Sequence, residues 1–164
     1  MEPAPAPGVL FVCLGNICRS PTAEGVFRAA AERAGMAQHV RIDSAGTGDW
    51  HIGEPPDRRA IAAARERGIE LAHLRARQVE RADFARFDWI LAMDCSNLAA
   101  LDAMRPDSYR GHLGLFLDFA PELGVAEVPD PWSGGPHAFA RVLDLVERAS
   151  EALLAQVRAG LSRR

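Results

Sequence analysis

The sequence predicts an α/β fold in which one domain is built on a doubly wound, four-stranded parallel sheet flanked by helices. Short apolar runs rich in β-branched and aromatic residues alternate along the chain with longer segments of helical periodicity. Such alternation is typical of parallel sheets, whose strands are joined by helical crossovers. No internal repeat or linker-like composition divides the 164 residues. We therefore expect one domain, 1–164, with frayed ends at 1–7 and 160–164.

Each predicted strand is a short apolar run bounded by turn-forming residues. The strands are expected at 8–12, 39–44, 88–93 and 112–117. The helices are expected at 21–34, 57–67, 80–85, 94–104 and 136–159. Ser20 is expected to cap the first helix ahead of Pro21, and Asp57 to cap the second, which Gly68 terminates. Loops rich in Gly and Pro cover 47–56 and 118–135, and 71–78 is irregular.

Composition narrows the class of protein. The formal net charge is −3 and every basic side chain other than histidine is Arg, so nucleic-acid binding is not indicated. No apolar run is long enough to span a membrane, and the Pro/Ala-rich start does not resemble a secretory signal. Cys13, Cys18 and Cys95 form neither a disulfide framework nor a zinc-binding pattern. We expect a cytoplasmic protein without metal or other cofactor that binds neither nucleic acid nor membrane.

Residues 13–19, here called the cysteine loop, join the first predicted strand to the first helix. Amide groups of such a loop and the helix N-terminus together attract anions. A cysteine there lies in a positive potential that favours the thiolate. Arg19 offers a planar pair of donors for two phosphate oxygens, and Gly15 allows the backbone to turn its amides inward. The loop thus combines a nucleophile, an anion cradle and a counter-charge. For a bare Cys-x5-Arg pattern, a buried and inert cysteine remains the alternative.

The longer string from Cys13 to Pro21, CLGNICRSP, is more specific. It resembles the phosphate-binding loop of the low-molecular-weight protein tyrosine phosphatases, bacterial-type members included, and the resemblance extends from Val9 to about Gln156. It implies that the loop binds phosphate at the carboxyl end of the first strand and that Cys13 and Arg19 are catalytic. The other loop residues that it implies are Leu14, Gly15, Asn16, Ile17, Cys18 and Ser20, with the Ser20 hydroxyl on the thiolate.

The same resemblance identifies a general acid in the segment 128–133, which reads VPDPWS. An Asp-Pro pair in a loop is by itself usually a turn former. The resemblance makes Asp130 the acid that protonates the leaving group and then the base that activates water. Trp132 and Trp50 are expected to line the substrate slot. Ser133 stands where animal members usually carry a second tyrosine.

Supporting residues are also implied. Asn16, Ser44 and His73 match positions that brace the loop in this family. Asp94 matches an acidic position of the family, and capping of the following helix explains it equally well. Cys18 has two interpretations, a reversible disulfide partner of Cys13 and a small buried side chain, and both stay open.

The resemblance implies a protein-tyrosine phosphatase that hydrolyses phosphotyrosine through a phosphocysteine intermediate without metal. Its expected partners are phosphotyrosine-containing proteins and aryl phosphates, with inorganic phosphate or other oxyanions as inhibitors, and it is expected to be a monomer or weak dimer.

Four alternatives are weaker. An arsenate reductase would need a downstream cysteine relay, and only Cys95 is available. The related arginine phosphatases tend to carry Thr where this chain has Ile17. A non-catalytic phosphate-binding module would not need Asp130. A nucleotide-binding P-loop is excluded because its glycine–lysine motif is missing.

Overall fold

The computed structural model describes residues 5–162. Its sheet has four parallel strands in the order β2-β1-β3-β4, which confirms the predicted fold class. The strands are β1 (Gly8–Cys13), β2 (Arg41–Gly46), β3 (Trp89–Ala92) and β4 (His112–Leu115). The helices are α1 (Arg19–Arg33), α2 (Arg58–Arg65), α3 (Asp83–Arg86), α4 (Cys95–Met104) and α5 (Pro136–Ser162), with 3₁₀ turns η1 (Phe116–Phe119) and η2 (Pro121–Leu123).

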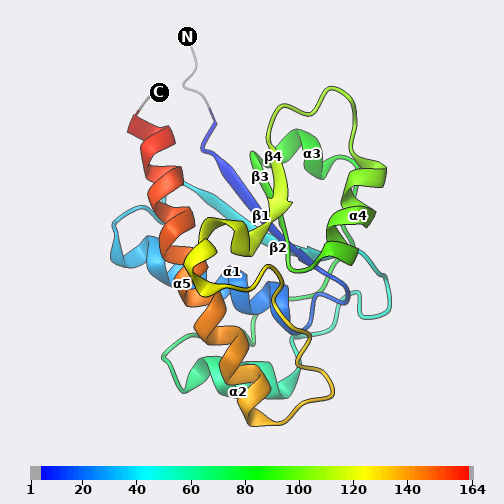
Figure 1. Cartoon of the computed structure of the whole chain (residues 1–164), viewed down its shortest axis with the longest axis vertical. Helices are drawn as coiled ribbons and strands as arrows, with labels where there is room; N and C mark the ends of the chain where they lie inside the picture. Colours follow the sequence, from blue (N-terminus) through cyan, green and yellow to red (C-terminus); the bar gives the residue numbers. More distant parts are fainter. Residues whose placement is uncertain (1–4, 163–164) are drawn as a thin grey trace.

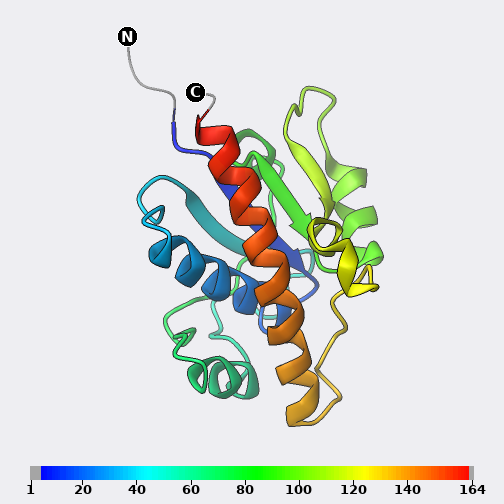
Figure 2. The same ribbon diagram turned by 60° about the vertical axis from the view of Figure 1, so that its left-hand side comes forward.

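Helices cover both faces of the sheet (Figures 1 and 2). The side chains of β1 alternate between the two faces, as strand geometry requires. Val9 and Phe11 belong to the apolar cluster formed with α1 and α5, whereas Leu10 and Val12 belong to the cluster formed with α3 and α4. Because β1 lies in the middle of the sheet and is buried along its whole length, its carboxyl end is a rigid platform for whatever follows it.

Several predicted element ends differ from the structure. The strand β4 ends at Leu115 instead of 117, and α5 continues to Ser162, so the described residues 160–162 are helical and not frayed. The helix α1 begins at Arg19, and Cys18 at its N-cap makes no side-chain capping bond. The prediction that Ser20 caps this helix is therefore wrong, because Ser20 already lies in the first turn. The strand β2 continues to Gly46 instead of ending at Ser44. Asp57 does cap α2, since its side chain accepts a hydrogen bond from the Arg59 amide.

Gly46 shows why β2 can run so close to the cysteine loop. It is the register partner of Cys13, and a Cβ atom added there would lie 2.7 Å from the Leu14 carbonyl oxygen. No side chain fits in that space, so glycine allows the loop to pack directly on the strand. The end of β2 therefore forms the floor beneath residues 14–16.

Candidate active site

Cys13 ends β1 with only 3% of its surface exposed, and two donors lie near its sulfur. The Asn16 amide nitrogen is 3.3 Å from Sγ, and the Ser20 Oγ is 3.0 Å from it. Ser20 Oγ also accepts a hydrogen bond from Asn16 Nδ2 at 2.8 Å, so its own proton is available to the sulfur. The other acceptor near that proton, the Ala45 carbonyl oxygen, is more distant at 3.4 Å. This geometry stabilises negative charge on Cys13.

Asn16 holds the loop in shape. Its backbone has φ of +58°, a left-handed conformation that asparagine tolerates better than most residues. Its amide nitrogen Nδ2 donates to Ser20 and, at 3.0 Å, to Ser44 Oγ, while its Oδ1 accepts from the Arg77 amide at 3.0 Å. A single side chain thus connects the cysteine loop to α1, to β2 and to the segment before α3.

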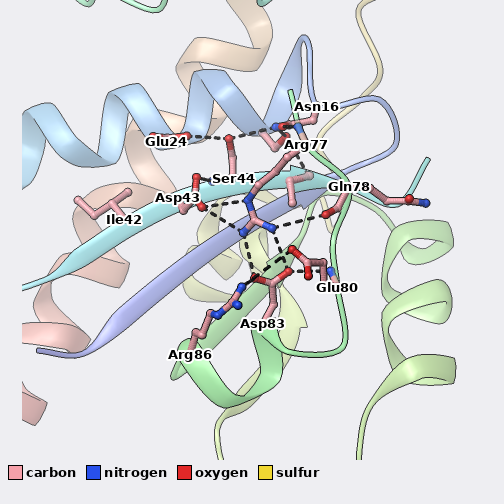
Figure 3. A network of polar contacts seen from close by, with 12 residues as sticks. Asn16, Glu24, Ile42, Asp43, Ser44, Arg77, Gln78, Glu80, Asp83 and Arg86 are labelled. Carbon is pink, nitrogen blue, oxygen red and sulfur yellow. Dashed lines mark hydrogen bonds and ion pairs between the residues drawn. The ribbon is translucent and has the colours of Figure 1, made fainter. Parts of the chain in front are cut away.

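The connections continue into a polar network that Figure 3 displays. Ser44 Oγ donates to Glu24 Oε1 at 2.7 Å, and burial raises the pKa of the Glu24 carboxyl. The Arg77 guanidinium donates to Asp43 and, through two nitrogens, to both carboxylate oxygens of the fully buried Asp83. The network anchors the brace of the cysteine loop to the sheet and to α3, so the loop cannot shift independently of them.

His73 does not take the supporting place that the resemblance implied. It is exposed, and among residues 5–162 its ring makes no hydrogen bond to Asn16 or to Ser44. The segment places half-buried Leu74 against the core instead, which leaves the neighbouring His73 at the surface. The expectation for His73 is wrong in this respect. The Arg77 amide and the Glu24 carboxyl occupy the bracing positions.

Arg19 is held from behind by one of its nitrogens. Its Nη1 donates to Asp94 Oδ2 at 2.7 Å and to the Val128 carbonyl oxygen at 3.1 Å. Its Nε and Nη2 have no hydrogen-bond partner in the part of the chain that the structure describes. The other oxygen of Asp94 accepts from the Asn97 amide and caps α4. Both interpretations of Asp94 therefore hold at once, and it joins the site as a residue that orients Arg19.

A cavity of about 220 Å³ opens above the cysteine loop; we call it the cysteine cavity. It brings Asp130 together with Cys13 and Arg19, which are more than a hundred residues earlier in the chain. Asp130 is exposed on the loop 128–135, here called the acid loop, and its Oδ1 accepts a hydrogen bond from the Trp132 amide at 3.0 Å. The remaining lining residues are Leu14, Gly15, Ile17, Cys18, Trp50, His51 and Trp132. Of these, His51 was not predicted; its position beside Trp50 was the available signal.

The two tryptophans form exposed walls of this cavity. Trp50 is 68% exposed and Trp132 53% exposed. The Trp50 indole lies against Gly48, where an added Cβ would be 1.8 Å from ring atom Cζ3, so only glycine permits this ring position. The Arg59 guanidinium lies over the Trp132 ring, with its carbon Cζ 5.4 Å from the ring centroid. Arg59 is itself paired with Asp57, and this contact lowers the pKa of the Asp57 carboxyl.

Cys18 has both of the surroundings that its two interpretations require. It is buried in a small apolar cluster that includes Ala60 and Phe139, and it also lines the cysteine cavity. Burial raises the pKa of its thiol to about 12, and the nearby Asp57 carboxylate adds to the effect. Cys18 is therefore a protonated thiol at neutral pH.

Within residues 5–162 no group of three or more His, Cys, Asp or Glu side chains is arranged to hold a metal ion. In the same range no helix has the length and apolar character needed to cross a bilayer.

The fold and the cavity together define a class, the doubly wound α/β proteins that carry a cysteine and an arginine at the carboxyl end of a central strand. Residues 8–163 match the model of one family in this class, described as low molecular weight phosphotyrosine protein phosphatase, and the chain belongs to that family.

Individual relatives agree with this assignment. A low molecular weight protein-tyrosine-phosphatase of Streptomyces coelicolor is 46% identical over 153 residues, which cover 92% of this chain and 93% of the relative. A crystal structure of a protein tyrosine phosphatase from Entamoeba histolytica has a TM-score of 0.91 at 37% identity and covers 94% of this chain and 99% of its own. A Drosophila arginine phosphatase has a TM-score of 0.85 at 29% identity, with 90% and 96% covered.

Proposed function

We propose that this chain is a protein-tyrosine phosphatase that hydrolyses phosphotyrosine through a phosphocysteine intermediate and uses no metal. One observation carries the proposal. Cys13, Arg19 and Asp130 line the same cavity, and two hydrogen-bond donors lie at the Cys13 sulfur. These are a nucleophile, a cationic oxygen ligand and a proton donor in one place. Membership in a family of phosphotyrosine protein phosphatases supports the same activity.

In the first step, Cys13 Sγ attacks phosphorus, and the bond from phosphorus to the phenolic oxygen breaks. Asp130, protonated, gives its proton to that leaving oxygen, so a neutral phenol departs. The Nε and Nη2 groups of Arg19 and the amides of residues 14–19 bind the equatorial oxygens, where negative charge is concentrated in the transition state. Asp94 aims Arg19 by occupying its Nη1.

In the second step, the Asp130 carboxylate takes a proton from water, and the resulting hydroxide attacks phosphorus. The sulfur–phosphorus bond breaks and Cys13 leaves as a thiolate. The Asn16 amide and the Ser20 hydroxyl lie within hydrogen-bonding distance of this sulfur and stabilise it as a leaving group. Asp130 regains its proton, and inorganic phosphate is released.

The cavity walls support an aromatic phosphate as substrate. Trp50 and Trp132 present flat apolar surfaces on which a phenyl ring can pack. Ile17 lines the cavity where the related arginine phosphatases tend to carry Thr, which favours phosphotyrosine over phosphoarginine. We further propose that the enzyme acts in the cytoplasm on phosphotyrosine-containing proteins, as a monomer or weak dimer, and that inorganic phosphate and similar oxyanions inhibit it.

The test measures phosphate release from a phosphotyrosine peptide and from a phosphoarginine peptide of the same sequence, in the presence of a chelator. We expect turnover of the phosphotyrosine peptide in the wild-type protein and in Cys95→Ser, which changes an exposed cysteine outside the cavity. Cys13→Ser should abolish turnover and still bind inorganic phosphate, because the amide cradle remains.

Each other outcome has a definite meaning. Preference for phosphoarginine would keep the mechanism and overturn the substrate. Turnover that survives Cys13→Ser would refute the nucleophile, and absence of turnover of both peptides would refute the activity.

A further inference from the structure

A second and larger cavity lies at the opposite end of the sheet. It has a volume of about 500 Å³, compared with about 220 Å³ for the cysteine cavity. Its walls come from the amino ends of the strands, including Arg41 at the start of β2 and Asp88 just before β3, and from α3 and the loop before β4. The length of β1, roughly 17 Å, separates this end of the sheet from the cysteine cavity. It is therefore not an extension of the substrate slot.

The lining is strongly cationic. Four arginines, Arg41, Arg81, Arg86 and Arg110, face one acidic lining residue, Asp88. The whole protein has a formal net charge of −3, so this concentration of positive charge runs against its overall balance. A cleft lined by one sign of charge focuses its field and attracts counter-ions. We call it the arginine cavity.

Most of this charge is not neutralised by carboxylates. The Arg41 guanidinium donates to the Ala6 and Arg86 carbonyl oxygens and lies 5.5 Å from the Phe87 ring centroid. Arg110 Nη1 donates to the Asp107 carbonyl oxygen at 3.3 Å. These partners fix the direction of the side chains but carry no charge.

The other two arginines, Arg81 and Arg86, are also weakly paired or unpaired within residues 5–162. Arg81 is exposed, and its side chain makes no hydrogen bond or ion pair with any residue that the structure describes. Arg86 approaches carboxylates only loosely, at 3.7 Å from Asp83 and 4.0 Å from Glu80. Asp88 already accepts a hydrogen bond from the Gly8 amide at 2.7 Å. The arrangement leaves guanidinium groups free to bind an anion.

We propose that the arginine cavity binds a compound that carries linked phosphate groups. Guanidinium groups recognise phosphate oxygens in pairs, and several of them around one cavity suit several phosphates. A single phosphate would leave most of the space and most of the charges unused. Phe84 and Tyr109, whose rings meet edge to face at 5.1 Å, add an aromatic wall. Either an inorganic polyphosphate or the triphosphate of a nucleotide supplies this chemistry.

The test is isothermal titration calorimetry at physiological salt with two probes, inorganic tripolyphosphate and ATP. Three proteins are compared: the wild type, the double variant Arg81→Gln/Arg110→Gln, and the control Arg33→Gln/Arg141→Gln. The control removes the same charge from exposed arginines that lie outside the arginine cavity and whose side chains make no hydrogen bond or ion pair with any described residue. Both double variants change exposed side chains, so we expect each to fold. In parallel, inhibition of aryl phosphate hydrolysis by each probe reports binding at the cysteine cavity.

We expect the cavity variant to weaken calorimetric binding by at least about tenfold and the control variant to leave it unchanged. The inhibition constants of tripolyphosphate and ATP, and the rate of aryl phosphate hydrolysis, should be the same in both double variants as in the wild type. Binding of tripolyphosphate as tight as that of ATP assigns the site to the phosphate chain alone, and tighter binding of ATP assigns it to a nucleotide. Equal affinity in the wild type and the cavity variant would overturn the proposal. The calorimetric experiment measures binding without turnover, so its result does not depend on the proposed phosphatase activity. A failure of that activity would be seen only in the hydrolysis assay.

Discussion

The two loops that meet at the cysteine cavity are built in opposite ways. The cysteine loop is buried except at Leu14 and Gly15, and its residues Asn16 and Arg19 are hydrogen-bonded to other elements of the fold. The acid loop is exposed at Asp130 and Trp132, and the hydrogen bonds around these two residues are local, from the Trp132 amide to Asp130 and from the Gly134 amide to the Pro131 carbonyl oxygen. Among residues 5–162, only the ends of this loop are hydrogen-bonded to the rest of the fold, at Val128 to Met93 and Arg19 and at Gly134 to Arg59.

This difference matches the two tasks that we propose. A cradle for the transition state has to be in place before the substrate arrives, because reorganising dipoles during reaction would cost the stabilisation that they provide. A general acid has to release a proton, accept one back and let substrate and product pass, which suits an accessible loop. The predictions that follow test each side of the comparison.

The largest effect is expected at the acid. Asp130→Asn keeps the size of the side chain and removes the proton donor, so hydrolysis of phenyl phosphate should slow about 10²- to 10⁴-fold. Hydrolysis of p-nitrophenyl phosphate, whose leaving group needs less protonation, should slow much less. Measuring kcat for both substrates checks this. An equal loss for both would count against the acid role of Asp130.

The next effect is expected at the brace of the cysteine loop. Asn16→Ala removes three hydrogen bonds and puts alanine in a left-handed conformation, which should lower the free energy of unfolding by about 2–4 kcal/mol. Because the cradle loses its shape, kcat should fall roughly 10- to 100-fold for both leaving groups alike. Chemical denaturation and steady-state kinetics measure the two effects. Asn97→Ala, which removes another buried amide side chain, is the control and should leave kcat unchanged.

A smaller effect is expected where the acid loop is attached to α2. Arg59 lies over the Trp132 and Phe139 rings and donates to the Gly134 carbonyl oxygen. Arg59→Ala should therefore reduce kcat for phenyl phosphate by roughly threefold to tenfold. Arg58→Ala is the matched control on the preceding residue. Equal kcat values of the two variants would show that the contacts of Arg59 with the acid loop do not affect catalysis.

The last prediction concerns the pH dependence of Cys13 oxidation, which leaves the turnover of the reduced enzyme unchanged. Peroxide should convert Cys13 to a sulfenic acid, and attack by the Cys18 thiolate should then form the disulfide and release hydroxide. The raised pKa of Cys18, about 12, means that its thiolate fraction and hence this rate should rise about tenfold per pH unit between pH 7 and 9. Mass spectrometry of quenched samples measures the disulfide, with Cys18→Ser as the blank. A rate of disulfide formation that does not change with pH would contradict the assignment of Cys18 as the attacking thiol with a raised pKa.

The comparison also explains which parts of the site the sequence could predict. Cys13, Asn16 and Arg19 lie in one short strand–loop–helix segment, so local rules and a compact motif identify them. The contact of Asp94 with Arg19 depends on β3 lying next to β1, which no local pattern specifies. The two oxygens of Asp94 also allow it to cap α4 and to orient Arg19 at the same time. The sequence presents these two roles as alternatives, because it does not show that each uses a different oxygen.

The errors have similar physical causes. Ser20 was predicted as a helix cap because serine favours that position, but α1 begins two residues earlier than predicted, and the Ser20 hydroxyl lies near Cys13 and Asn16. His73 was placed by resemblance in a segment whose burial pattern turns it to the surface. In both cases the neighbours of the side chain depend on where an element begins or which residue of a loop faces the core, and sequence spacing alone does not resolve this.

The tether on Arg19 has a consequence for the entropy of binding. A free arginine side chain has about 2 kcal/mol of rotamer entropy to lose when it is immobilised. Asp94 and the Val128 carbonyl oxygen immobilise Arg19 through Nη1 in the folded protein itself. That loss therefore occurs during folding and is absent from the association step. An oxyanion that binds to the remaining Nε and Nη2 groups therefore contacts donors that are already immobilised.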